Sequence, residues 1–450
     1  MSELSPDRAS RAALGIIRAL RDAGHTAYLA GGCVRDLLIG SAAKDYDIAT
    51  DATPDRVQAL FPKTQEVGAS FGVVLVKHEG VAIEVATFRS DGPYSDSRRP
   101  DTVVFSTPER DARRRDFTIN ALFLDPLDLR DPAGDPNGNE PVRAEPRHRG
   151  AAERYTEQGL VIDFVGGLED IKRKLIRAVG DADKRLAEDH LRALRAVRFA
   201  SRYGFDLDEE TAEAIRRHAS ELRGVSRERI GDEDRRMLGH PSRHLAAWTL
   251  QYLGLDEPVL LEPSRKAAPK RLGRIGDESR YWTRLAAWAI DRGSIIEATQ
   301  IAPLVARYRE ALNLSNEERD GLKAVLGGVA HLLRGWPGMS TAAQKRAAAS
   351  DWFLESLRIV ASENPEEGAR IKTRVEQLQR TPSGLAPEPL VDGRTLIEAG
   401  FAPGPVFKRV LDAVYDAQLE DRVSTAAEAI ELARLLAAEV GEDEDESGPV

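Results

Sequence analysis

The chain has 450 residues, of which 42% are hydrophobic and 31% charged; this composition excludes wholesale disorder, and the length predicts two to four domains. The longest uncharged stretch, residues 244–255, falls short of the ~18 apolar residues of a membrane span, and the N-terminus lacks a signal-peptide pattern. Cys33 is the only cysteine, which excludes an internal disulfide and a cysteine-based zinc site. We therefore expect a cytoplasmic protein without membrane contact, and the net charge of −10 disfavours a uniformly basic nucleic-acid binder while leaving room for a local basic groove.

The first part of the chain has the pattern of an α/β region. Residues 5–23 predict an amphipathic helix that begins at Ser5-Pro6 and ends before a glycine. Short apolar runs with glycines follow, and two of them, residues 72–77 and 81–88, flank Glu79-Gly80 and predict a β-hairpin. Residues 131–159 are polar and rich in Pro and Gly, which predicts a solvated loop or an insertion; its central part, residues 132–158, suggests no function.

A helical period dominates from residue 166 onward. Residues 380–389, rich in Pro, Gly and Ser, predict a linker between helical parts, and the acidic residues 441–450 predict a disordered tail. The pattern therefore predicts an α+β fold, with a mixed β-sheet in the N-terminal part and helices throughout the remainder.

Gly31-Gly32 stands where an apolar run meets a helical pattern. Glycines at such a junction let a ligand approach the backbone, and Arg35, one turn further on, can contact a phosphate. A tight turn without a ligand explains the same residues.

Asp45 and Asp47 are two residues apart, so on a strand both carboxylates face the same side. Because like charges this close repel, the pair favours a bound divalent cation, and two such ions can clamp a phosphoryl displacement. The alternative is a pair of solvated turn aspartates. Glu84, in a later predicted strand, is either a third carboxylate facing this pair or an outward-facing residue.

Residues 113–121 bring together groups that suit a nucleotide. Arg115 can bind a triphosphate, while Asp116 and Asn120 offer an acceptor and an amide for ribose hydroxyls. A basic surface turn before a buried helix is the alternative interpretation.

Asp189, Arg192, Arg195 and Arg198 recur every three residues on a predicted helix and form one polar stripe. Residues 171–202 hold ten Lys and Arg against four Asp and Glu, a basic excess in an acidic chain. A solvated face held by Asp–Arg pairs within the helix is the alternative.

An Asp–Arg pair can also distinguish bases. Cytosine and adenine both present an exocyclic amine beside a ring-nitrogen acceptor, which match the carboxylate of Asp189 and the guanidinium of Arg192. Uracil and guanine reverse this pattern and would leave buried groups unpaired. Such a pair accepts C and A and rejects U and G.

Taken together and in this order, the motifs resemble the class II tRNA nucleotidyltransferases, or CCA-adding enzymes, and the related bacterial poly(A) polymerases. The resemblance is continuous over about residues 27–233 and returns near the end of the chain. The matching stretches are LAGGCVRD with DYD, FRSDGPYSDSRRPDTVVF, RRRDFTINAL, VIDFVGGLEDI, EDHLRALRAVRFA, VSRERIGDE and LVDGRTLIEAGFAPGPVFKRVLDAVYDAQLEDR.

The resemblance implies a head, neck, body and tail. We expect a catalytic nucleotidyltransferase head over residues 1–165, an all-α neck that recognises the base over 166–238, a helical body over 239–388 and a tRNA-binding tail over 389–440. The expected substrates are CTP, ATP and the 3′ end and elbow of tRNA; the expected metal is Mg²⁺.

The resemblance also implies roles for single residues. Asp45 and Asp47 would be catalytic and would hold two Mg²⁺ ions. The nucleotide would contact Gly32, Arg35, Arg115, Asp189, Arg192, Arg195 and Arg198, of which Asp189 and Arg192 would read its base.

Several functions stay open from the sequence. The function that the motifs favour most is that of a complete CCA-adding enzyme. The alternatives are a poly(A) polymerase and an enzyme that adds only A. A CC-only enzyme is disfavoured because the loop 89–103 is intact. A non-catalytic RNA-binding protein on the same fold is disfavoured because both Asp45 and Asp47 are present. The oligomeric state is open.

Overall fold

The computed structural model divides the chain into two compact units. The first comprises Met1–Met237 with Thr249–Ser264, and the second comprises Leu238–Trp248 with Arg265–Val450. No helix in the part that the structure describes is long and apolar enough to cross a membrane. The structure describes residues 8–43, 45–66, 72–94, 100–129, 148–293, 297–402 and 405–445.

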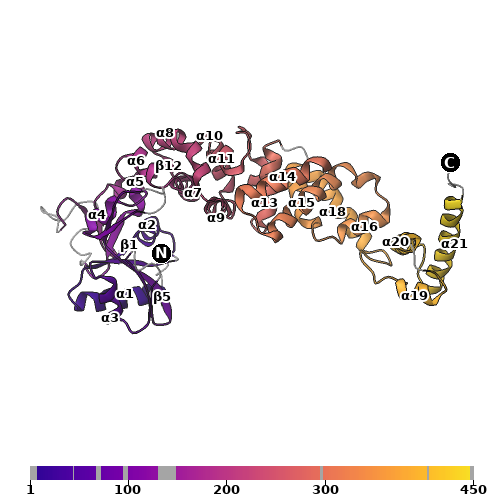
Figure 1. Ribbon diagram of the computed structural model, residues 1–450, viewed down its shortest axis with the longest axis horizontal. Coiled ribbons are helices and arrows are strands. Elements are labelled where there is room, and N and C mark those ends of the chain that lie inside the picture. The colour runs from indigo at the N-terminus through magenta and orange to yellow at the C-terminus, as the bar shows by residue number, and fades with distance from the viewer. Residues whose placement is uncertain are drawn as a thin grey trace. The chain divides into compact units, whose positions relative to one another are not determined.

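An eight-stranded mixed sheet forms the centre of the first unit (Figure 1). Its order is β3-β4-β5-β2-β1-β8-β10-β9, and all neighbouring strands are antiparallel except β2 and β5, which run parallel. The predicted α+β fold with a mixed sheet is thereby confirmed. The strands are β1 (Ala27–Ala30), β2 (Asp47–Thr50), β3 (Thr64–Glu66), β4 (Val73–His78), β5 (Val81–Thr87), β8 (Leu122–Asp125), β9 (Ala152–Thr156) and β10 (Gly159–Asp163).

Helix α1 (Arg8–Asp22) packs its apolar face on this sheet. Ile16, Ile17 and Leu20 are fully buried and share a core with residues of the strands and of α3 (Pro54–Leu60). The helix predicted over residues 5–23 is confirmed over these bounds, and its predicted start at Ser5-Pro6 lies outside the described residues. Between β1 and β2, the short helix α2 (Gly32–Leu38) follows Gly31 directly.

The predicted hairpin is confirmed as β4 and β5. Glu79 and Gly80 have φ values of 49° and 77°, and positive φ at both positions is what a two-residue turn of type I′ requires. A smaller hairpin pairs β6 (Arg89–Asp91) with β7 (Val103–Phe105). It leads into α4 (Pro108–Arg113) and the 3₁₀ turn η2 (Thr118–Asn120).

The prediction of a solvated loop over residues 131–159 is wrong at its C-terminal end. There β9 pairs antiparallel with β10 and forms one edge of the sheet. An edge strand tolerates charged side chains because only one of its sides needs backbone partners, so its polar sequence resembled a loop. Residues 130–147 lie outside the described residues.

Helices complete the first unit beyond the sheet. The predicted apolar stripe is confirmed, because Leu191, Leu194 and Val197 are all buried. The elements from here to α11 are α5 (Gly167–Arg173), β11 (Leu175–Ile176), α6 (Ala182–Glu188), α7 (Arg192–Tyr203), β12 (Asp206–Leu207), α8 (Glu209–His218), the 3₁₀ segment η4 (Ala219–Gly224), α9 (Arg227–Leu238), α10 (Arg243–Leu253) and α11 (Asp256–Leu260). Of these, α10 contributes residues to both units.

The described part of the second unit is helical and has no strand. Between α18 and α19 no helix forms over residues 380–392, which agrees with the predicted linker over 380–389. The helices that follow α11 are α12 (Lys270–Arg274), α13 (Tyr281–Asp291), α14 (Ala298–Leu312), α15 (Asn316–Arg334), η5 (Trp336–Gly338), α16 (Thr341–Ala348), α17 (Phe353–Glu363), α18 (Pro365–Gln379), α19 (Gly393–Glu398), α20 (Pro405–Leu419) and α21 (Ala426–Asp445).

The segment 380–392 is held in place by specific polar contacts. The fully buried Lys345 of α16 donates to the hydroxyls of Thr381 and Ser383 at 2.5 and 2.7 Å. Gln418 of α20 donates to the carbonyl of Glu388 at 2.8 Å.

The expected disordered tail over 441–450 needs a correction, because α21 continues to Asp445. Acidic residues that follow a helix can extend it when their own helix propensity is adequate, as it is for Glu. Residues 446–450 lie outside the described residues.

Candidate active site

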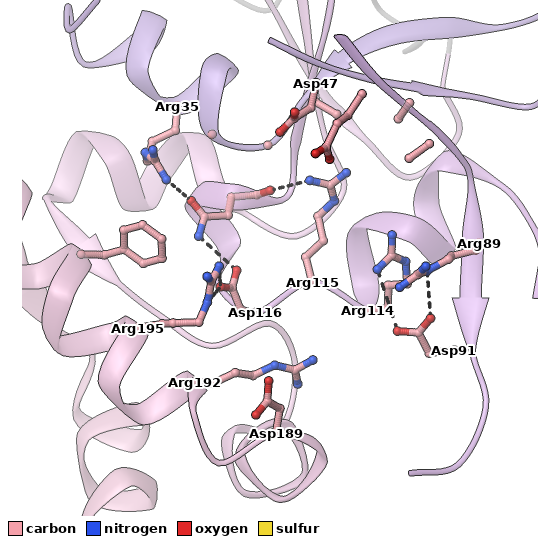
Figure 2. Close-up of a pocket in the computed structure, with 18 of the residues that line it drawn as sticks. Arg35, Asp47, Arg89, Asp91, Arg114, Arg115, Asp116, Asp189, Arg192 and Arg195 are labelled. Atoms are coloured by element: carbon pink, nitrogen blue, oxygen red, sulfur yellow. Dashed lines mark hydrogen bonds and ion pairs between the residues drawn. The ribbon is translucent and has the colours of Figure 1, made fainter. Parts of the chain in front are cut away.

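One pocket of the first unit gathers nearly all of the predicted site residues (Figure 2). It has a volume of about 750 Å³ and is lined by residues of β1, β2, β5 and α7, among others. Asp45 is exposed and does not line it. The predicted residues that do line it are Gly32, Arg35, Asp47, Arg115, Asp189, Arg192, Arg195 and Arg198.

Asp47 and Glu84 form an acidic side of this pocket. Asp47 is the first residue of β2 and is paired in register with Glu84 on the parallel neighbour β5. Paired residues on neighbouring strands direct their side chains to the same face of the sheet. The structure therefore favours the inward-facing alternative for Glu84, which lines the pocket beside Asp47.

The predicted geometry of the Asp45–Asp47 pair is wrong in one respect. Because β2 begins at Asp47, Asp45 lies in the connection before the strand and does not alternate with Asp47 along it. The carboxylates still influence one another. Partial withdrawal from water raises the pKa of Asp47 to about 6, with Glu84 and Asp45 adding to the rise and Arg115 opposing it. A hard divalent cation would relieve this repulsion, so the donor set fits such an ion.

Arg115 reaches the pocket from the turn after α4. Its guanidinium donates to Asp111 Oδ2 at 3.0 and 3.2 Å and to the carbonyl of Asn120 at 3.1 Å. Asp111 is almost fully buried; burial alone would raise its pKa, but Arg115 and Arg114 outweigh this and hold the pKa below its ordinary value. Asp111 thus stays ionised and positions both arginines.

Gly31 makes room for this arrangement. Its φ is +74°, and a Cβ atom at this position would lie 2.7 Å from Nη1 of Arg115. A larger residue would be strained and would displace the guanidinium. Gly31 was predicted to allow a ligand to approach the backbone closely. In the structure it makes room for the Arg115 side chain.

Arg35 is a buried part of the pocket wall. It donates to Asp36 Oδ1 at 2.7 and 2.9 Å and contacts Oδ1 of Asn120 (Figure 2). Its guanidinium also lies over the rings of Tyr203 and Phe199, 4.7 and 5.1 Å from their centroids. Because only 5% of its surface is exposed, Arg35 has fewer hydrogen-bond donors available to an incoming phosphate than an exposed arginine would have.

Asp116 and Asn120 were predicted to bind ribose hydroxyls, but their polar groups are hydrogen-bonded to other residues of the pocket wall. Asp116 accepts two hydrogen bonds from Arg195 and one from Nδ2 of Asn120. Burial alone would raise the pKa of Asp116, but Arg195 and the hydrogen bonds from Asn120 and the Phe117 amide hold it well below its ordinary range. This carboxylate is ionised and committed to Arg195.

Asp189 and Arg192 lie together on another side of the pocket, across from Asp47 (Figure 2). The prediction that Asp189 belongs to the same helix as the three arginines is wrong. α6 ends at Glu188 and α7 begins at Arg192, so Asp189 lies in the turn between them. Its backbone carbonyl and its Oδ1 accept from the amides of Arg192 and Leu191, because a short polar side chain favours a turn of this kind.

Each residue of this pair has a partner elsewhere. Arg229 of α9 donates to Asp189 Oδ2 at 2.7 Å. Arg192 donates to Glu188 Oε2 at 2.5 Å and to the carbonyl of Arg185 at 2.6 Å. These contacts hold both side chains at the pocket.

Arg198 occupies the next turn of α7. It donates to Glu233 of α9 at 2.6 Å and lies 4.3 Å from the centroid of the Phe199 ring. Arg195 lies over the same ring at 5.3 Å. Together with Arg35, three of the predicted arginines therefore lie over the Phe199 ring, a role that the sequence did not suggest.

The sequence also did not single out Arg89, Asp91, Tyr94 and Arg114, which line the pocket. Tyr94 donates to Asp91 Oδ2 at 2.7 Å, and Arg89 lies 3.2 Å from Asp91 Oδ1. Burial raises the pKa of Tyr94 to about 12, and its hydrogen bond to Asp91 contributes to this. The first three lie in the FRSDGPY stretch and Arg114 in the RRRDF stretch, where residue type alone assigns them no role.

The pocket thus combines carboxylates that suit a divalent cation with guanidinium groups that suit a triphosphate, on a mixed sheet followed by helices. These are the requirements of nucleotidyl transfer, in which catalysis is mostly positioning and charge stabilisation. The fold and the site together define a nucleotidyltransferase.

Comparisons with known proteins name the family. A profile described as "Poly A polymerase head domain" matches residues 27–138, and one described as "Probable RNA and SrmB-binding site of polymerase A" matches residues 204–266. A CCA-adding enzyme of Geobacillus thermodenitrificans is 35% identical over 438 residues, which cover 93% of this chain and 95% of the relative. A CCA-adding enzyme of Geobacillus stearothermophilus is 36% identical with the same coverage. The chain belongs to the family of CCA-adding enzymes.

Solved structures agree with this assignment. The crystal structure of a Bacillus stearothermophilus CCA-adding enzyme in complex with CTP matches 98% of this chain and 100% of its own, with 30% identity and a TM-score of 0.72. A Thermotoga maritima CCA-adding enzyme complexed with tRNA shares the fold at 18% identity, with a TM-score of 0.63. Family membership implies a divalent metal, which the carboxylates at Asp47 fit.

Proposed function

We propose that this chain adds C, C and A to the 3′ end of tRNA, with CTP and ATP as substrates, in the pocket between Asp47 and Arg192. The observation that carries the proposal is that this one pocket has the carboxylates of Asp47 and Glu84 on one side and the side chains of Asp189 and Arg192 on another. The tRNA 3′-hydroxyl attacks the α-phosphate of the nucleotide and pyrophosphate leaves.

Asp45 and Asp47 are the proposed ligands of Mg²⁺, with Glu84 as a neighbouring carboxylate. When bound, the metal neutralises charge that develops on the phosphates during displacement. The raised pKa of Asp47 supports this assignment, because it reflects partial withdrawal from water together with the nearby carboxylates of Glu84 and Asp45, which Arg115 offsets only in part.

Arg115 is the proposed ligand of the triphosphate. It lies between the carboxylates and the helix α7, and Asp111 holds it in a fixed orientation. The backbone at Gly32 allows a phosphate to approach closely. Arg35 and Arg195 shape the wall, and their buried hydrogen bonds indicate that they orient other residues more than they contact the phosphates directly.

Asp189 and Arg192 are proposed to select the base. In this role Asp189 accepts from the exocyclic amine of cytosine or adenine, and Arg192 donates to the ring nitrogen. Arg198 supports the same wall through Glu233. Uracil and guanine present the reverse pattern of donors and acceptors, so neither side chain would find a complementary group on the base, at a cost of about 1–3 kcal/mol for each lost contact.

We assign nucleotidyl transfer to the head (residues 1–165) and base selection to the neck (166–238). The body (239–388) and the tail (389–440) are the proposed binding surfaces for the acceptor and elbow of tRNA. The compact units divide the chain near residue 238 as well, although residues 249–264 return to the first unit.

The poly(A) alternative loses support because relatives that match over nearly their full length are CCA-adding enzymes, whereas the profile described as a poly(A) polymerase head matches residues 27–138 alone. An enzyme that adds only A would have the same head, so an experiment must separate these outcomes.

The test is nucleotide incorporation with Mg²⁺ on three RNAs: a tRNA transcript without CCA, a tRNA that ends in CC, and an unstructured primer. We expect C, C and A in sequence on the first, a single A on the second and little on the third. A on the CC-ended tRNA alone would indicate an A-only enzyme, and long A runs on the primer would indicate a poly(A) polymerase. No addition to any RNA would favour the non-catalytic alternative.

A further inference from the structure

A second cluster of metal-ligand side chains lies outside the nucleotide pocket. His190, His218 and Glu221 each offer one ligand atom, and these atoms lie within 4.8 Å of one another. His190 belongs to the turn before α7, His218 ends α8, and Glu221 lies in η4. We propose that these three residues bind one zinc-type transition-metal ion.

The distances fit a single small ion. Glu221 Oε2 lies 3.0 Å from Nδ1 of His190 and 2.8 Å from Nδ1 of His218. Ligand atoms at the metal distances typical of zinc, roughly 2.0–2.1 Å, stand about 3.3 Å apart in a tetrahedron, so small adjustments admit the ion. Two imidazoles and one carboxylate are a donor set that suits zinc, with water in the fourth position.

His190 provides an independent indication. Its Nδ1 is buried and has no hydrogen-bond partner among the described residues, although a carboxylate oxygen lies 3.0 Å away. A buried ring nitrogen without a hydrogen bond costs free energy. Coordination to a metal ion would satisfy it.

The surroundings of His218 also match a metal ligand. Its other nitrogen, Nε2, lies 3.1 Å from Oδ1 of Asp183 at the start of α6. Arg217 in turn holds Asp183 with hydrogen bonds of 3.0 and 2.7 Å. Histidines that bind a metal usually donate their second N–H to a carboxylate, which fixes the tautomer and orients the ring. Asp183 occupies this second position.

The location gives the site a consequence for the reaction, and this part rests on the proposed function. His190 directly follows Asp189, which lines the nucleotide pocket. A metal bound to His190 would tie the turn that carries Asp189 to η4 through Glu221. The ion would therefore position the base-selecting turn without touching the nucleotide.

The test is a titration of the full chain with Zn²⁺, and with Co²⁺ as a spectroscopic probe, in excess Mg²⁺ so that the carboxylates at Asp47 are occupied. We expect one equivalent of ion and the intense visible bands of four-coordinate Co²⁺. His190→Ala and His218→Ala should each weaken binding at least about 100-fold, and Asp183→Asn by about 10–100-fold, because Asp183 orients the His218 ring. Glu221→Gln provides a conservative variant of similar shape should an alanine variant unfold.

His25→Ala is the matched control, because His25 also pairs with a carboxylate, that of Asp51 at 3.1 Å, and should leave binding unchanged. Equal affinity in the wild type, His190→Ala and His218→Ala, or the absence of a bound equivalent in the wild type, would overturn the proposal and leave a histidine–glutamate hydrogen-bond cluster. Because binding is measured without turnover, failure of this site is distinguishable from failure of the proposed function.

Discussion

Arg195 donates two hydrogen bonds to one oxygen of Asp116, from Nε at 2.8 Å and from Nη2 at 2.6 Å. The two residues are 79 positions apart and come from the RRRDF and EDHLRALR stretches, which the sequence presents as separate motifs. Their pairing fixes α7, and with it Arg192, relative to the turn that carries Arg115. This partly buried ion pair thereby joins the parts of the pocket that we propose to bind the phosphates and to select the base.

Breaking the Arg195–Asp116 pair should lower both the stability of the protein and its activity. Arg195→Met leaves Asp116 as a nearly buried carboxylate without its cation, which should lower the free energy of unfolding by about 2–3 kcal/mol. Because the pKa of Asp116 is lowered in the folded state, this contribution is fully present above its ordinary pKa of 3.8 and is lost as the pH falls below it. Urea unfolding at pH 7 and at low pH measures this, and an equal difference between the two proteins at both values would contradict it.

Asp47→Asn should abolish nucleotide addition and stabilise the metal-free protein. Activity should fall at least roughly 100-fold, because a catalytic metal contributes several kcal/mol. A pKa raised from 3.8 to about 6 means that the ionised carboxylate costs stability, and this cost develops as the pH rises from 3.8 to about 6 and is fully present above that. It corresponds to at most about 3 kcal/mol, and solvent screening reduces it to about 1 kcal/mol.

Without divalent ions at pH 7.5, the thermal unfolding midpoint of Asp47→Asn should therefore be higher than that of the wild type. Added Mg²⁺ should raise the midpoint of the wild type only. Asp45→Asn should lose activity with the fold intact. Asp51→Asn, a matched change just beyond the end of the same strand, should retain activity. Full activity in Asp45→Asn and Asp47→Asn would refute the metal role.

Arg192→Ala should reduce discrimination against UTP and GTP. Loss of one base-edge contact of about 1–3 kcal/mol predicts a 10- to 100-fold change in the ratio of kcat/KM values for CTP and UTP. Arg202→Ala also removes an arginine from the pocket and should leave this ratio unchanged. An unchanged ratio in a folded and active Arg192→Ala enzyme would place base selection elsewhere.

Lys345→Met should destabilise the helical second unit. Lys345 is fully buried, and its loss leaves the hydroxyls of Thr381 and Ser383 without their donor, at a cost of about 1–3 kcal/mol. We expect faster proteolysis within residues 380–392 and a lower urea midpoint. The exposed Lys372→Met should change stability by less than about 0.5 kcal/mol; equal effects of the two substitutions would contradict the assigned role of Lys345.

Local sequence signals predicted the parts of the fold that depend on neighbours in the chain. The turn at Glu79-Gly80 requires positive φ at two positions, and its flanking runs alternate as strands do, so the hairpin could be placed. The apolar stripe of α7 could also be read from its spacing. The polar edge strand β9 could not, because its partner β10 determines that it forms.

The partners of the site residues were beyond the reach of the sequence. Whether Glu84 faces Asp47 depends on β5 lying parallel to β2, a strand order that no local pattern reveals. Arg229 and Glu233 hold pocket residues through tertiary contacts, and the stripe spacing wrongly placed Asp189 on α7. The sequence identified the groups that carry charge, whereas their pairing required the structure.

If CTP and ATP occupy the same pocket, as we propose, the two nucleotides must compete for binding. Equilibrium titration of the wild type with CTP, repeated at increasing ATP in the presence of Mg²⁺, should show one equivalent of CTP whose apparent Kd rises in proportion to ATP, with Arg115→Ala weakening both nucleotides. Binding of CTP that is unaffected by saturating ATP would reveal two independent sites and contradict the account.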